Sequence, residues 1–100
     1  MVQAIENWAA LEGTVRDMRT SDVRADLDEV DVAVDRVEPV DPYPNLLSET
    51  LGSTVSVTIP KDVVKRLSIE PGVRIRCQAR RTSPLDVFAR PDSVTVVGRT

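Results

Sequence analysis

Apolar and polar residues alternate along several segments of the chain, and this period of two is typical of strands with one buried face. The alternation predicts strands over residues 30–39, 54–59 and 73–80. Residues 86–89 and 93–97 carry the same pattern on both sides of a proline-containing break, so we expect them to form one interrupted strand. The chain from residue 30 onward is therefore predicted to be rich in β-structure.

The beginning of the chain is less regular. Leu11, Gly13 and Val15 alternate with polar residues and predict a strand centred on Gly13. Residues 1–10 are expected to be a helical or irregular lead-in to that strand. Residues 17–29 are polar and acid-rich, and we expect them to form a loop with the composition of a mobile segment.

Prolines and glycines mark the breaks between the later strands. Residues 45–51 are expected to form one or two helical turns that end at Gly52. Pro60 suits the first position of a short helix, which the spacing of apolar residues extends over 61–67. A Pro-Gly turn at 70–72 then leads into the next strand.

The predicted order is strand, long loop, strand, loop, strand, short helix, strand, turn, strand. In this order the chain resembles the OB-fold, a small Greek-key barrel, along nearly its whole length. We therefore expect a mainly β protein: one domain over residues 1–100, built as a five-stranded OB-like barrel with a short helix between strands 3 and 4. Gly13, inside the first strand, suits the bend that such a barrel needs there.

A second, local resemblance covers residues 52–75. Val-Thr-Ile-Pro-Lys, a short helix and Leu-Ser-Ile-Glu-Pro-Gly follow one another there, and this order is similar to that of the swapped-hairpin AbrB/MazE family. Members of that family are dimeric and bind duplex DNA, usually through basic residues before the Ile-Pro step. In this chain residues 47–58 contain no basic residue and one acid, Glu49. The resemblance implies an AbrB-like dimeric DNA-binding regulator.

The composition excludes most catalytic classes. The chain has no histidine and a single cysteine, Cys77. This composition excludes histidine-dependent catalysis, histidine-ligated metal sites and zinc sites made of several cysteine thiolates. Its four glycines are scattered, so no phosphate-binding loop or dinucleotide motif is present. The acidic run at 26–31 lacks the glycine and glutamate that shape an EF-hand. We expect a non-enzymatic protein without a cofactor or metal, and a buried Cys77.

Charge is distributed unequally between the two halves of the chain. Residues 1–51 contain four Arg and twelve acids, net −8, whereas residues 52–100 contain nine basic residues and four acids, net +5, which together give the net charge of −3. Such a division is compatible with internal neutralisation, with a basic binding surface, or with docking between oppositely charged faces.

Arginines on the polar side of the 73–80 strand form the main candidate site. They recur at every second or fourth residue and continue into the next turn and strand, so they could follow the phosphates of a nucleic acid. The predicted nucleic-acid-binding residues are Arg74, Arg76, Arg80, Arg81 and Arg90. A structure in which Arg74 and Arg76 are bridged to Asp31 or Asp35 would contradict phosphate tracking.

Aromatic residues are few, which argues against a single-strand binder that stacks many bases. Trp8 and Phe88 are expected to lie in the core. Tyr43 stands between two prolines in a loop, and we expect it to be exposed as an anchor for a protein partner.

Two functions from different classes follow, besides the AbrB-like alternative. The first is an OB-like binding module that associates with nucleic acid through the arginines, within a larger complex. The second is a structural or adaptor subunit whose acidic and basic faces dock onto protein partners or onto copies of itself. No targeting signal and no apolar run of about 20 residues is present, so we expect a cytoplasmic protein that does not act in a membrane.

Overall fold

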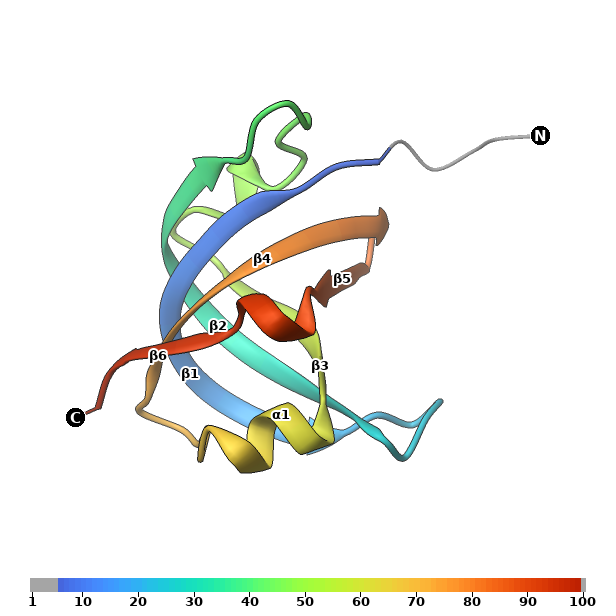
Figure 1. The fold of residues 1–100 in the computed structure, drawn as a ribbon, viewed down its shortest axis with the longest axis vertical. Helices are drawn as coiled ribbons and strands as arrows, with labels where there is room; N and C mark the ends of the chain where they lie inside the picture. The colour runs from blue at the N-terminus through green and yellow to red at the C-terminus, as the bar shows by residue number, and fades with distance from the viewer. Residues whose placement is uncertain (1–5, 100) are drawn as a thin grey trace.

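Strands dominate the part of the chain that the structure, a computed structural model, describes, which is residues 6–99 (Figure 1). The strands are β1 (Ala9–Thr20), β2 (Leu27–Pro39), β3 (Thr54–Pro60), β4 (Arg74–Ser83), β5 (Asp86–Ala89) and β6 (Thr95–Gly98). A helix, α1 (Lys61–Arg66), and two short 3-10 segments, η1 (Ser48–Thr50) and η2 (Pro91–Ser93), connect them.

The strands close into a barrel. The order is β1-β2-β3-β5-β4, and pairing of β1 with β4 joins the two ends of the sheet. The contact between β3 and β5 is parallel, and the other pairings are antiparallel. With α1 between β3 and β4, this is the OB-like five-stranded barrel that the sequence predicts.

The interrupted last strand is confirmed. β5 and β6 both pair with β4, and η2 separates them. Strand β4 therefore has three neighbours, because β1 lies along one of its edges while β5 and β6 share the other. Proline at the start of η2 cannot donate a ladder hydrogen bond, which explains the break in the strand.

The predicted loop over 17–29 is wrong in its extent. β1 continues to Thr20 and β2 begins at Leu27, so the turn that joins them covers only residues 21–26. Most polar residues at 17–20 and 27–29 are outward positions at the ends of a long hairpin, whereas Asp28 points inward and is buried. The lead-in is irregular rather than helical over residues 6–8, and residues 1–5 lie outside the described part of the chain.

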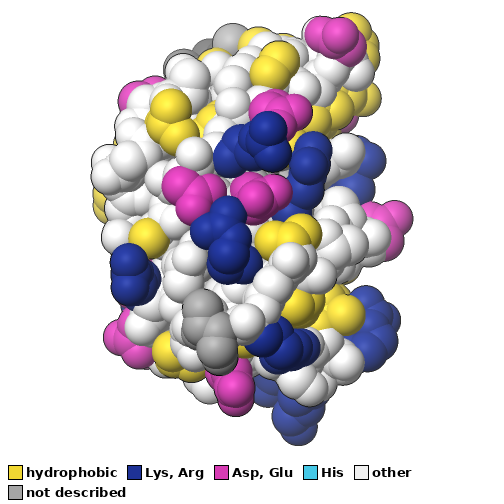
Figure 2. Space-filling model, turned by 90° about the vertical axis from the view of Figure 1, so that its left-hand side faces the viewer, with side chains coloured by type: hydrophobic (Ala, Val, Ile, Leu, Met, Phe, Trp, Pro, Cys, Tyr) yellow, Lys and Arg dark blue, Asp and Glu magenta, His cyan; other side chains and the backbone are white. Residues whose placement is uncertain are grey.

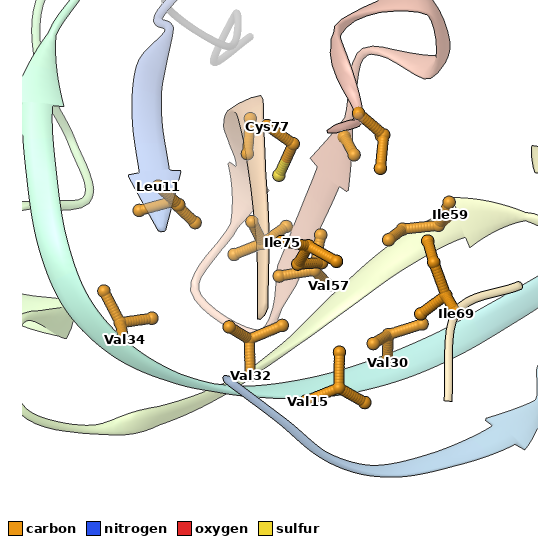
Figure 3. Packing of buried hydrophobic residues seen from close by; sticks show 14 of the residues in the cluster. Leu11, Val15, Val30, Val32, Val34, Val57, Ile59, Ile69, Ile75 and Cys77 are labelled. Carbon is orange, nitrogen blue, oxygen red and sulfur yellow. The ribbon is translucent and has the colours of Figure 1, made fainter. Parts of the chain in front are cut away.

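Inward-facing side chains from all five barrel strands make the core (Figure 3). Its labelled members are Leu11, Val15, Val30, Val32, Val34, Val57, Ile59, Ile69, Ile75 and Cys77. Val63 and Val64 of α1 are also buried, and the helix lies across one end of the barrel (Figure 1). Each buried Val, Leu or Ile contributes about 1.5–3 kcal/mol relative to exposure.

In the described residues no helix combines the length and apolarity needed to cross a membrane.

Gly13 allows β1 to bend sharply against β2. A Cβ atom at this position would lie 2.1 Å from the Ala33 carbonyl oxygen, which is far inside van der Waals contact. The register between the two strands also shifts between Glu12 and Gly13. The prediction that a glycine is needed inside the first strand is therefore confirmed.

Candidate functional site

Acidic side chains of β1 and β2 neutralise the first part of the arginine row. Arg74 Nη1 donates to Asp35 Oδ2 at 2.6 Å, and Arg74 Nη2 donates to Glu12 Oε2 at 2.9 Å. Arg76 lies 3.9 Å from Glu38. Figure 2, which views the side of the barrel that carries β6 and the C-terminus, shows basic and acidic side chains interleaved across its centre.

The Arg74 cluster behaves as one charge-assisted network. The Arg74 guanidinium lowers the pKa of Asp35, first by hydrogen bonding and then by its charge. Asp35 and Glu12 in turn raise the pKa of Arg74 above its ordinary value. From the sequence, phosphate tracking is expected to fail if both Arg74 and Arg76 pair with Asp31 or Asp35. Arg74 does pair with Asp35, and Arg76 faces a different acid, Glu38. Arg74 is therefore neutralised within the chain, whereas the half-exposed Arg76 has only the long contact with Glu38, which also pairs with Arg36 at 2.9 Å.

Arg81 holds three chain segments together. Its Nη1 and Nε atoms donate to the carbonyl oxygens of Pro84 at 2.6 Å and of Leu46 at 3.2 Å, and its Nη2 atom lies 2.9 Å from Glu49. Its backbone N–H also donates to Asn7 Oδ1 at 2.9 Å. In this position Arg81 ties the loop before β3 and the start of β1 to β4.

Arg80 and Arg90 are placed differently from the other predicted arginines. Both guanidinium groups lie over the Trp8 ring, with the Arg90 carbon at 4.4 Å and the Arg80 carbon at 5.7 Å from the ring centroid. Such cation–π contacts are worth about 0.5–1 kcal/mol at exposed sites. Within residues 6–99 neither arginine forms an ion pair.

The expectation that Trp8 and Phe88 lie in the core is wrong. Both side chains are only partly buried. Val87 and Ala89 point inward, so Phe88 between them points outward, directly opposite Arg80 on β4. We call the outward group Trp8, Arg80, Phe88 and Arg90 the aromatic strip.

A groove lies between two turns on the side of the barrel that carries β3. The tip of the β1–β2 hairpin projects at the lower right of Figure 1, and the β4–β5 turn lies higher on the same side of the barrel. The groove between them has a volume of about 520 Å³. Its lining residues are Ser21, Asp22, Val23, Arg24, Leu27, Glu29, Thr58, Asp86 and Phe88. We call it the turn groove.

Acidic groups outnumber basic ones in the turn groove. Its one basic residue, Arg24, is bound to Asp26 through two hydrogen bonds of 2.6 and 3.1 Å. Asp22 and Asp86 have no basic partner in the described part of the chain. Arg24 also holds the pKa of Asp26 below its ordinary value, mainly through its hydrogen bond to the carboxylate.

Each of the two turns that border the turn groove carries an exposed apolar side chain at its rim. Val23, which lines the groove, and Leu85, next to the lining residue Asp86, are each 89% exposed. Together with Leu27 and Phe88 of the lining, they make this side of the barrel the candidate for an apolar contact.

Tyr43 does not have the predicted exposure. Its side chain is partly buried, and its backbone N–H donates to the Val40 carbonyl oxygen at 2.9 Å. It lies outside the set of residues that line the turn groove. Its role as a partner anchor stays a prediction.

The acidic run at 26–31 is used for internal pairing. Asp28 is bound by Lys61 at 2.6 Å and Asp31 by Arg19 at 3.0 Å, while Glu29 lies 3.8 Å from the same Arg19. Across residues 6–99 no three His, Cys, Asp or Glu side chains are arranged to hold a metal ion.

Sequence reasoning missed the turn groove. Asp22 and Val23 were part of the predicted loop, whereas Asp86 was the first residue of a predicted strand more than 60 positions away. The available signal was an isolated apolar residue, Val23 or Leu85, in each of two polar segments. That both segments border one groove is apparent only once the barrel has closed.

The segment that resembles the AbrB/MazE family forms β3, α1 and the start of β4 in the closed barrel. In comparisons with known proteins, no family model matches the chain and no curated protein is similar enough to count as a relative.

Proposed function

We propose that this protein is a non-enzymatic, OB-like adaptor module that binds a protein partner through the turn groove and its two rims. The observation that carries the proposal is a groove lined by Val23 and Phe88, bordered by two turns whose apolar residues Val23 and Leu85 are each 89% exposed. OB-folds bind their ligands over strands 2 and 3, between the loops that join strands 1 to 2 and 4 to 5. The turn groove occupies that place, which supports the proposal as an analogy of fold.

The charges favour a protein over a nucleic acid in this groove. Asp22, Glu29 and Asp86 would repel phosphates. Arg74 and Arg76, which were expected to attract them, face acids of the same chain. An adaptor also accounts for the small number of aromatic residues.

Site-specific crosslinking tests the adaptor proposal. A photoreactive residue would replace Val23 or Leu85 in the full chain expressed in its native cell. Val97, which is 47% exposed on β6, provides the matched control position. We expect a discrete protein adduct from the two rim positions and none from Val97. Absence of adducts at the rims, or equal adducts at all three positions, would refute the proposal.

A second candidate function is nucleic-acid binding on the aromatic strip. Trp8 and Phe88 point outward on either side of Arg80, and Arg80 and Arg90 are free of ion pairs within residues 6–99. Stacking of a base on an aromatic ring contributes about 1–3 kcal/mol. This would be a weak, salt-sensitive contact with a few nucleotides.

Fluorescence anisotropy with labelled single- and double-stranded oligonucleotides at low and moderate salt tests this second candidate. The variant Arg80→Ala/Arg90→Ala should lose binding, whereas Arg74→Ala/Arg76→Ala should retain most of it. The opposite result would restore the arginine row predicted from the sequence. If neither oligonucleotide binds at low salt, the nucleic-acid function is excluded.

The AbrB-like alternative stays a prediction from the sequence. It requires an interlocked dimer, so a monomer in sedimentation equilibrium would contradict it.

A further inference from the structure

We propose that the occupant of the turn groove is an extended, positively charged segment of the partner protein, with one apolar side chain between two basic ones. This inference rests on the proposed adaptor function and adds the chemistry of the partner. The apolar side chain would contact Val23 and Phe88 of the lining, and the basic side chains would lie at Asp22 and Asp86.

The shape of the site favours an extended segment. The groove runs between two narrow turns over the outer faces of β2, β3 and β5, which contribute Glu29, Thr58 and Phe88 to its lining. These three side chains are neighbours in the sheet register, because Glu29 pairs with Thr58 and Thr58 pairs with Phe88. A volume of about 520 Å³ accommodates a few side chains. It falls within the range of sites that hold a small ligand or a short stretch of peptide.

The charge of the site favours a basic segment. Asp86 accepts a hydrogen bond from the Ser83 hydroxyl at 2.6 Å, which fixes its carboxylate without neutralising it. Asp22 lies on the opposite turn and has no basic partner in the described part of the chain. Glu29 lies between them on β2, and its nearest base, Arg19, binds Asp31 more closely. Two carboxylates without a basic partner among residues 6–99, Asp22 and Asp86, together with Glu29, which has only the 3.8 Å contact with Arg19, attract lysine or arginine and disfavour phosphate.

A second copy of the chain is a weaker choice of occupant. Arg80 and Arg90 of another copy have the right charge, but both are engaged with the Trp8 ring. The exposed basic residues Arg16, Lys65 and Arg66, which form no ion pair within residues 6–99, lie on β1 and α1 and not on a free, extended segment. An extended segment can place its basic side chains at Asp22 and Asp86 without breaking such contacts. Self-association is therefore an outcome that the test must distinguish.

Peptide binding followed by NMR tests the inference on the full chain. The probe is a short Gly-Ser peptide that carries one leucine flanked by two lysines. The first control peptide has glutamate in place of lysine, and the second has serine in place of leucine. We expect amide shifts at the groove residues with the lysine peptide, and at least about tenfold weaker binding of each control peptide.

The matched protein variant is Asp22→Asn/Asp86→Asn, which keeps the size of both side chains. This double variant should bind the lysine peptide about tenfold more weakly than the unmodified protein. Its binding should also depend less on salt concentration, because salt screens the attraction between exposed charges. Asp62→Asn/Asp92→Asn, which changes two exposed acids outside the groove, should bind like the unmodified protein.

The outcomes distinguish a failure of the adaptor function from a failure of the inference that the partner segment is basic. If the rim crosslinks capture a protein but the glutamate peptide binds as well as the lysine peptide, the adaptor function stands and the basic partner is wrong. If the rim crosslinks fail, the adaptor function itself is wrong. Amide shifts that depend on protein concentration without peptide would mean self-association and would also overturn the inference.

Discussion

At Gly13, β1 passes so close to β2 that a methyl group would overlap the Ala33 carbonyl group. Backbone atoms cannot move aside as the end of a flexible side chain can. The small size of this residue is therefore a condition for closing the barrel, since the bend at Gly13 lets β1 pair with β2 and β4 together.

Substitution Gly13→Ala should destabilise the protein by at least about 2 kcal/mol, in the range of overpacked interiors. For a domain of this size, that corresponds to a loss of roughly 10 °C in Tm. Thermal unfolding followed by circular dichroism measures the effect. Gly98→Ala is the matched control, because the nearest atom to its added Cβ lies at 3.8 Å and only a small change is expected. Equal effects of the two substitutions would contradict the role of Gly13.

Trp8 and Phe88 were expected to lie in the core, but the alternation of their neighbours decides the direction of their side chains. Ala9 and Val87 point inward, so the adjacent aromatic residues point outward. Strand register, applied to every residue and not only to the aliphatic ones, would have predicted this.

Among the elements, α1 is fastened to the β1–β2 hairpin by one side chain. Lys61 donates to Asp28 at 2.6 Å and to Thr20 at 2.9 Å, and the side chain of Asp28 is only 10% exposed. Both acceptors lie in the segment that the polar composition predicted as a loop. The buried Asp28 carboxylate is explained by its pairing with Lys61, a basic residue more than 30 positions away. No local sequence pattern reveals this pairing.

Removal of the Lys61 side chain should destabilise the protein. Lys61→Ala leaves the Asp28 carboxylate buried without its partner and should lower the free energy of unfolding by about 2 kcal/mol. In the double variant Asp28→Asn/Lys61→Ala the loss should be smaller, because no charge is left uncompensated. Urea denaturation measures both. Lys65→Ala on the exposed face of α1 should be nearly neutral, and a Lys61→Ala variant as stable as Lys65→Ala would refute the tie.

The contact of β4 with β1 and β2 predicts a dependence on pH. Arg74 lowers the pKa of Asp35 below its ordinary value of 3.8. The stabilisation is therefore complete above that ordinary value and is lost as the pH falls through the lower folded value. Asp35→Asn should reduce the acid-induced drop in the urea midpoint, by a small amount because the carboxylate is 52% exposed.

Asp92→Asn is the control for this measurement, since Asp92 has no ion pair within residues 6–99. If Asp35→Asn leaves the acid-induced drop as steep as Asp92→Asn does, the Arg74 network does not contribute to stability.

For the whole molecule, alternation and turn residues were enough to predict the barrel. Val57 and Ile59, for example, follow the predicted face of β3. A bridge from Arg74 to Asp31 or Asp35 could be considered from the sequence, but the pattern could not select Asp35. Arg74 and Asp35 are 39 positions apart and meet across β1, which pairs with both β2 and β4 in the closed barrel. Opposite net charges in the two halves of the chain were the general signal of such neutralisation.

Cys77 gives a direct measure of the stability of the whole barrel. Burial raises the pKa of its thiol to about 12, so the folded protein holds almost no thiolate at neutral pH. Alkylation with iodoacetamide should therefore follow the same urea transition as the loss of β-structure in circular dichroism. Labelling well below that transition would mean that the barrel opens locally around β4.

The pairing of β1 with β4 also has a consequence for the order of folding. Ala9 pairs with Ala79, seventy positions further along the chain. During synthesis the β1–β2 hairpin emerges long before the strand that covers its apolar side. Non-local pairing of this kind slows folding and prolongs the exposure of apolar surface. The nascent chain therefore passes through a stage in which half a barrel must stay unaggregated until β4 arrives.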